Sequence, residues 1–173
     1  MKQFFGLFVL AMLVFSCNSD QSSSSSGGGK NLSTALGSAK PPELPAMKYE
    51  EEVKALTMDF WIFEHYIITG DREASLFNKG KWFQFYTNGT FKNGHWEEDT
   101  GEGTFFLKDG PMGAILTLDN VDDSQDAEYE IQGINPAKDE MSWVGTGTYG
   151  NNKHFAKPLR LYTKPTKAQF GVE

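Results

Sequence analysis

The chain has 173 residues, one cysteine and a formal net charge of −7. Its length fits a single domain. The excess of acidic residues argues against a nucleic-acid partner, because phosphate binding depends on clustered lysines and arginines. A single cysteine excludes both an internal disulfide and a cysteine-rich zinc site.

The N-terminus predicts a secretory signal over residues 1–16. Lys2 supplies a positive charge, and an apolar run follows over residues 4–15. This run is too short for a membrane-spanning helix, which needs about 20 residues, and it suits a signal peptide, which needs about 7–15. Ser16 then precedes Cys17, the single cysteine. The alternatives are an ordinary secretory signal with a chance cysteine, or an uncleaved anchor.

The stretch Val14-Phe15-Ser16-Cys17 resembles the lipobox of bacterial lipoproteins, in which a branched apolar residue, a variable residue and a small residue precede a cysteine. The resemblance implies that Cys17 is acylated and becomes the mature N-terminus. Acyl chains stabilise membrane association by about 0.8 kcal/mol per buried CH₂. We therefore expect a membrane partner through acylated Cys17 and a place in the bacterial cell envelope, in the outer membrane, with the face left open.

Residues 17–46 are predicted to be the lipidated cysteine and a flexible tether. They contain five serines over 22–26, three glycines over 27–29 and three prolines over 41–45, and no aromatic residue. Such a segment buries too little apolar surface to offset its chain entropy. Ser19-Asp20 resembles part of the sorting signal of Bacteroidetes surface lipoproteins, although tether composition explains the same two residues.

The predicted domain covers residues 47–173 and opens with a short helix over 47–56. Its first turn carries acidic residues, which helix N-termini favour. Tyr49, Val53 and Leu56 fall on one helical face. One apolar stripe on a short helix indicates that it plugs another element.

The pattern then changes to strands. Apolar and polar residues alternate, and Asn88-Gly89 and Asp109-Gly110 are typical of hairpin turns. The sequence shows no second helical period, so the sheet is expected to be antiparallel. Closing it into a barrel would remove its edges, and a sandwich is the alternative. The eight predicted strands cover residues 60–68, 82–87, 90–96, 103–108, 114–118, 128–133, 141–146 and 159–162.

The domain resembles the small lipocalin-like domains of bacterial, especially Bacteroidetes, lipoproteins over residues 57–164. The resemblance rests on Trp61 in the first strand, on the block from Phe83 to Phe91, and on Gly103-Thr104-Phe105. Lipocalin first strands usually carry Gly-x-Trp, and Asp59 stands at the glycine position here. The resemblance implies an all-β, eight-stranded antiparallel up-and-down barrel with a short N-terminal helix and a binding role. It transfers no catalytic residue.

The expected ligand-binding residues lie inside the predicted strands. Strand phase also places His65 with Trp61 and Phe63, where it could orient a ligand together with Tyr66 or Arg160. Two alternatives stay open: these side chains line a cavity for an apolar or amphipathic ligand, or they fill the barrel completely. The candidates are Trp61, Phe63, His65, Phe83, Phe85, Tyr129 and Trp143.

The sequence favours no enzyme, cofactor or metal. The three histidines lie too far apart in the sequence for a local metal motif, and the chain has no Gly-x-Ser-x-Gly elbow. The acidic segment 119–126 could offer carboxylates to calcium, but it lacks the central glycine and final glutamate of an EF-hand, and we interpret it as a solvated connection. The segment 70–81 is the longest predicted loop. It carries Leu76 and Phe77 and is a candidate lid.

Two functions therefore compete. The first is a lipid-anchored envelope lipoprotein whose lipocalin-like barrel binds a small apolar or amphipathic ligand. The second is a packed barrel that acts as a protein-interaction or inhibitor module of an envelope complex. An internal cavity would favour the first, and an exposed apolar patch would favour the second.

Overall fold

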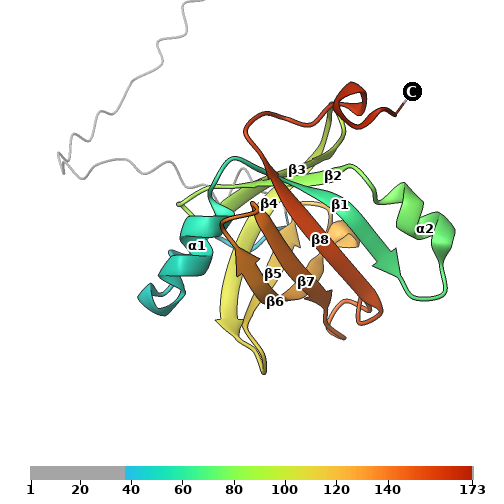
Figure 1. The fold of residues 1–173 in the computed structure, drawn as a ribbon. Coiled ribbons are helices and arrows are strands. Elements are labelled where there is room, and N and C mark those ends of the chain that lie inside the picture. The colour runs from blue at the N-terminus through green and yellow to red at the C-terminus, as the bar shows by residue number, and fades with distance from the viewer. Residues whose placement is uncertain (1–37, 173) are drawn as a thin grey trace, which may run out of the picture.

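The protein is described by a computed structural model over residues 38–172. Within these residues, eight antiparallel strands close into one barrel, and the last strand returns to pair with the first (Figure 1). This confirms the predicted eight-stranded up-and-down barrel. The elements are η2 (Met47–Tyr49), α1 (Glu50–Leu56), β1 (Phe60–Ile68), α2 (Arg72–Phe77), β2 (Lys81–Phe85), β3 (Thr90–His95), β4 (Glu98–Asp109), β5 (Ala114–Asn120), η3 (Asp123–Gln125), β6 (Ala127–Asn135), β7 (Glu140–Gly145), β8 (His154–Leu161) and η4 (Lys167–Phe170).

The helix α1 lies across one end of the barrel, as its apolar stripe predicts (Figure 1). Leu56 is completely buried and belongs to the interior cluster, and Tyr49 is also buried. The Tyr49 hydroxyl donates to Asp109 Oδ1 over 2.8 Å, which ties the helix region to the end of β4. The helix is therefore the plug that closes this end.

The Asn88-Gly89 hairpin forms between β2 and β3 as predicted. Gly89 has a φ of +85°, which only glycine adopts without strain, and its N–H donates to the Tyr86 carbonyl over 3.0 Å. A side chain at this position would also meet the Glu43 carbonyl oxygen at 2.6 Å. The glycine thus serves both the turn and the close passage of the preceding segment.

A β-bulge in β1 changes the phase of the strand. The pairing of β1 with β8 shifts between Phe63 and His65, which leaves Glu64 as the extra residue. A side chain points to the opposite face after such a shift. Tyr66 consequently points inward, and His65 is exposed. The prediction that His65 shares the inward phase of Trp61 and Phe63 is wrong for this reason.

A second apolar cluster, the outer cluster, lies on the outside of the barrel wall. It consists of Ile62, Trp82 and Trp96. The Trp82 indole N–H donates to the Trp96 carbonyl over 2.8 Å. The C-terminal segment crosses over β2 and β3 (Figure 1), and the ring of its Phe170 lies 5.6 Å from that of Trp96. The C-terminus therefore covers a wall that alternation alone would leave in water.

Two segments differ from the prediction. The predicted loop 70–81 contains α2, which Asp71 caps by accepting a hydrogen bond from the Ala74 N–H. Residues 38–46, predicted to be tether, lie against the barrel and are called the strap here. The Ser38 hydroxyl donates to the Val121 carbonyl over 2.6 Å, and the Thr104 hydroxyl donates to the Lys40 carbonyl over 2.9 Å. The packed domain thus begins before residue 47.

The predicted signal, Cys17 and most of the tether lie outside the described residues. Among the residues that are described, no helix has both the length and the apolar character needed to cross a bilayer.

Candidate functional site: clefts at the two ends of a filled barrel

The predicted binding residues fill the barrel centre. Six of the seven predicted residues, all except His65, expose 3% of their surface or less. Trp143 lies among them, with its ring centroid 5.6–6.3 Å from those of Phe63, Phe83, Phe85 and Tyr129. Rings at these separations are in direct contact. Of the two alternatives, the structure around Trp143 therefore favours a packed interior.

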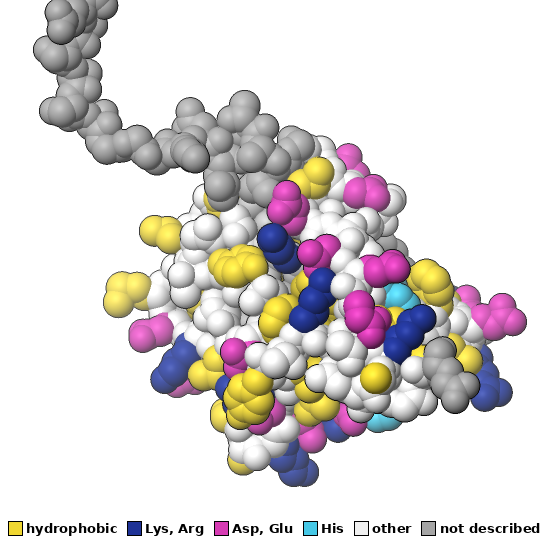
Figure 2. Space-filling view, turned by 90° about the horizontal axis from the view of Figure 1, so that it is seen from above, with side chains coloured by type: hydrophobic (Ala, Val, Ile, Leu, Met, Phe, Trp, Pro, Cys, Tyr) yellow, Lys and Arg dark blue, Asp and Glu magenta, His cyan; other side chains and the backbone are white. Residues whose placement is uncertain are grey.

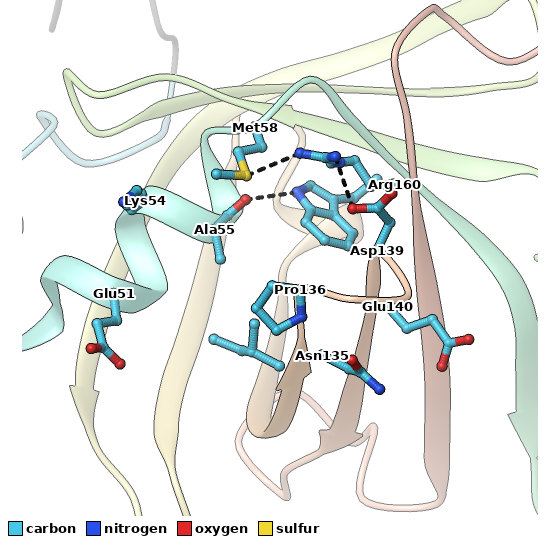
Figure 3. A pocket seen from close by; sticks show the side chains of 11 residues that line it. Glu51, Lys54, Ala55, Met58, Asn135, Pro136, Asp139, Glu140 and Arg160 are labelled. Atoms are coloured by element: carbon cyan, nitrogen blue, oxygen red, sulfur yellow. Dashed lines mark hydrogen bonds and ion pairs between the residues drawn. The ribbon is translucent and has the colours of Figure 1, made fainter.

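A cleft at the plugged end, called the α1 cleft here, is shown in Figure 3. Its volume is about 520 Å³, within the roughly 300–1,000 Å³ of small-molecule sites. Apolar and charged side chains both line it. The lining residues are Glu51, Lys54, Ala55, Met58, Trp61, Ile134, Asn135, Pro136, Asp139, Glu140 and Arg160.

Trp61 connects this cleft to the plug. Its indole N–H donates to the carbonyls of Ala55 and Leu56 over 3.2 and 3.0 Å, and it thereby satisfies acceptors that a helix end leaves open. The antiparallel pairing of β1 and β8 places Arg160 directly opposite Trp61. Trp61 and Arg160 are thus neighbours across the strand pair at the plugged end.

Arg160 is held from three sides. Its Nη2 lies 2.8 Å from Asp139 Oδ1, its Nη1 lies 3.1 Å from the Met58 sulfur, and its backbone N–H donates to the Asp139 carbonyl over 2.8 Å. The guanidinium also lies 5.0 Å from the Tyr162 ring centroid. Its Nε is buried and has no hydrogen-bond partner among the described residues. The cation is positioned firmly and retains one unused donor.

Asp59 precedes β1 at the position where lipocalins usually carry glycine. Its φ is +48°, in the left-handed region that favours glycine and that aspartate tolerates better than most residues. The backbone at this entry to the barrel therefore has the conformation that a Gly-x-Trp sequence suits.

The opposite end of the barrel carries a polar cluster. The Tyr66 hydroxyl lies 2.7 Å from His154 Nδ1 and 3.3 Å from the Tyr129 hydroxyl. Burial raises the pKa of Tyr66 and Tyr129. Burial and the nearby charge of Lys81 lower the pKa of His154. At neutral pH the cluster therefore holds two phenols and a neutral imidazole.

A second cleft, the α2 cleft, opens at this same end. Its volume is about 430 Å³, and its lining includes Phe77, Lys81, His95 and Gln125. The rings of Phe77 and His95 stack with centroids 5.9 Å apart. Lys81 stands at the start of β2 in the same phase as Phe83 and Phe85, whose side chains are buried in the interior. The α2 cleft therefore adjoins the packed interior at the barrel end opposite α1.

Two acidic residues of β6 are buried, although the alternation of this strand predicts a wet face. Glu128 accepts hydrogen bonds from Lys108 Nζ over 2.6 Å and from the hydroxyls of Thr117 and Thr146 over 3.0 and 2.7 Å, and Thr148 donates as well. Burial alone would raise the pKa of Glu128, but these donors outweigh it and lower the pKa to about 2. Glu130 accepts from the Met112 N–H over 2.6 Å. Loops folded over the strand account for both residues.

Of the remaining predicted candidates, His65 is exposed, whereas the segment 119–126 begins with two buried residues, Asp119 and Asn120. His65 Nε2 is 3.9 Å from Glu64 Oε2, and both side chains contact water. In the segment 119–126, Asp122 accepts from the Ser124 N–H and Asp126 from the Asn120 N–H. Over residues 38–172, no group of three or more His, Cys, Asp or Glu is arranged to hold a metal ion.

Several residues that line the two clefts were not predicted from the sequence. Met58, Ile134 and Asp139 meet at the α1 cleft only because the β6–β7 turn folds towards α1, and no local signal predicts that approach. Lys81 did carry a signal, because it shares the phase of Phe83 and Phe85. No protein-family model matches the chain, and neither the curated proteins nor the solved structures gave a match.

Proposed function

We propose that this protein is a lipid-anchored envelope lipoprotein that binds a small amphipathic ligand in the α1 cleft. The observation that carries the proposal is the combination of a filled barrel centre with a cleft of about 520 Å³ at its plugged end. The packed interior leaves no described space for a ligand at its centre, whereas the α1 cleft has enough volume for a small molecule. Binding therefore takes place beside the packed rings, at a site lined by Trp61 and Arg160 among the residues that the sequence suggested for ligand binding.

The chemistry of the α1 cleft favours a ligand with an apolar body and a polar group. Met58, Ile134 and Pro136 present apolar atoms, and Glu51 and Lys54 line the cleft from α1 (Figure 3). Asp139 already neutralises Arg160 at 2.8 Å. An amphipathic molecule can place its apolar part against the apolar side chains and its polar part beside the charged ones.

Ligand binding is tested by filling the cleft. The full chain is purified from its own membranes in a neutral detergent, and bound small molecules are identified by native mass spectrometry. Ala55→Phe places a ring in the cleft, whereas Ala137→Phe adds the same ring at an exposed position of the β6–β7 turn. We expect the wild type and Ala137→Phe to carry a ligand and Ala55→Phe to have lost it. Equal occupancy in all three, or an empty wild type, would refute the α1 cleft as the site.

The lipid anchor requires a separate test. Cells grown with labelled palmitate are expected to transfer the label to the wild-type chain, and Cys17→Ser is expected to lose both the label and the membrane association. Label that persists in Cys17→Ser would refute acylation at Cys17. Because this experiment does not involve the α1 cleft, failure of one part of the proposal leaves the other open to its own test.

One observation favours a protein-interaction or inhibitor module as a second candidate. Ile67 and Phe155 are register partners on β1 and β8, and they expose 52% and 40% of their surfaces on the barrel wall. On the face seen in Figure 2, hydrophobic side chains also stand among charges of both signs. A photo-crosslinker at residue 67 should then capture a protein in cells, whereas one at the exposed Met112 should not. Equal capture at both positions would remove this candidate.

A further inference from the structure

Lys81 is a cation with an unusual position. It belongs to the row of β2 side chains that points inward with Phe83 and Phe85, and its ammonium lies 5.5 Å from the Phe83 ring centroid. Among the described residues, Lys81 forms no ion pair within 4.0 Å and no side-chain hydrogen bond, whereas Lys48, Lys108, Lys157 and Lys164 each contact a carboxylate. Among the described residues, the Phe83 ring is therefore the one attractive partner of the Lys81 ammonium.

The walls of the α2 cleft complement this cation. Phe77 exposes 76% of its surface, and its ring stacks on the ring of His95. The Lys79 carbonyl oxygen lies 2.9 Å from Nε2 of His95 and holds that imidazole in place. Gln125 reaches the cleft from η3, fixed by a hydrogen bond from Asn93 Nδ2 over 3.1 Å. Glu98 also lines the cleft from β4, beyond ion-pair distance of Lys81. The cleft thus combines the stacked rings of Phe77 and His95 with an ammonium that has no ion pair among the described residues.

We propose that the α2 cleft is a second binding site, which takes a small aromatic or otherwise flat organic anion, with its carboxylate on Lys81 and its apolar face on Phe77. Partial burial of a cation without a counter-ion is unfavourable, and a bound carboxylate supplies that counter-ion. The exposed ring supplies the apolar contact. This site does not depend on the α1 cleft, because it lies at the opposite end of the barrel.

Burial also lowers the pKa of Lys81, as expected for an ammonium that leaves water without a partner. A bound anion favours the charged form and therefore opposes this shift. Lys81→Met keeps the length of the side chain and removes the charge. If the charge is uncompensated in the free protein, the variant should melt at the same temperature as the wild type or at a higher one.

The test uses the full chain in a neutral detergent and two matched probes, 1-naphthoate and its uncharged counterpart 1-naphthamide, in calorimetric titrations. We expect Lys81→Met to weaken naphthoate binding at least tenfold and to leave naphthamide binding within twofold. Lys79→Met, an exposed lysine next to the cleft, should leave both unchanged. Phe77→Ala should weaken both probes.

Three results would overturn the proposal. The first is wild-type protein that binds naphthoate no more tightly than naphthamide. The second is a Lys81→Met or Lys81→Gln variant that binds naphthoate as tightly as the wild type. The third is a clear loss of thermal stability in both Lys81 variants, since that would show the ammonium to be already compensated in the free protein.

Discussion

The carboxylate of Glu128 offers the sharpest test of how this barrel is held together. Its two oxygens accept from four side chains: Lys108 and three threonines. The backbone carbonyl of Glu128 also accepts a hydrogen bond from Asn151 Nδ2 over 2.9 Å. Through these contacts Glu128 fastens the β7–β8 connection to β6. Replacing it with glutamine keeps the shape but removes the charge and turns one acceptor into a donor.

The expected loss follows from the pKa. Lowering the pKa from 4.5 to about 2 corresponds to about 3 kcal/mol of stability, at about 1.4 kcal/mol per unit. The Glu128 side chain is 3% exposed but that of Lys108 is 55% exposed, so solvent screens the ion-pair share. We therefore expect Glu128→Gln to lower the free energy of unfolding by about 2 kcal/mol at pH 7, mostly through hydrogen bonds to the charged group.

The pH dependence gives an independent readout. The folded-state pKa lies below the unfolded one, so the stabilisation is complete above about pH 5 and is lost as the pH falls towards 2. Urea unfolding followed by tryptophan fluorescence should show the gap between wild type and Glu128→Gln shrinking over this range. Glu102→Gln, an exposed glutamate without a described side-chain hydrogen bond, is the control. A gap below 0.5 kcal/mol at pH 7, or one that persists unchanged at pH 3, would refute the reasoning.

Three further predictions concern the rest of the chain. Trp143→Ala should cost about 3–5 kcal/mol in urea unfolding, because it empties the packed interior, whereas His65→Ala should change stability by less than about 0.5 kcal/mol because the imidazole is exposed; equal effects would contradict the bulge in β1. Thr104→Val removes the hydroxyl that holds the strap, so backbone amides of the strap should exchange hydrogen faster while those of β4 stay protected; an unchanged strap would show that the bond is unimportant. Asp59→Val should lower stability by about 1–2 kcal/mol because its φ is positive, and Asp59→Gly should be tolerated in the same thermal melts; a tolerated valine would contradict the assigned backbone.

Much of the barrel follows from local pattern, because alternation and turn residues act between neighbours in the sequence. Asn88-Gly89 fixes one hairpin by its backbone requirement, and the inward phase of Phe83 and Phe85 follows from the strand period. These features need no knowledge of distant segments. The strands and their antiparallel order could therefore be predicted from the sequence.

The errors arise where a distant segment decides the environment. Glu128 is in phase with the wet face of β6, yet threonines of the β7–β8 connection cover it. On the outside of the wall, Phe170 and Val172 of the C-terminal segment pack against the outer cluster, and no local pattern indicates this contact. The strap has the composition of a tether and is nevertheless held by hydrogen bonds to β4 and the β5–β6 connection. Composition and period describe a residue's preference, but contacts across the fold determine its burial.

Apart from His65, strand phase identified the candidate residues that face the barrel centre, but it could not decide whether that centre is empty. The decision depends on volume, since six large inward side chains either leave a space or contact one another. Here the rings around Trp143 touch at centroid distances of 5.6–6.3 Å. Open space is instead found where the strands end, beside the plug at Trp61 and beside the start of β2 at Lys81. In a barrel rich in aromatic residues, ligand sites should therefore be sought among the residues that terminate the strands, and the central residues should be tested as a core.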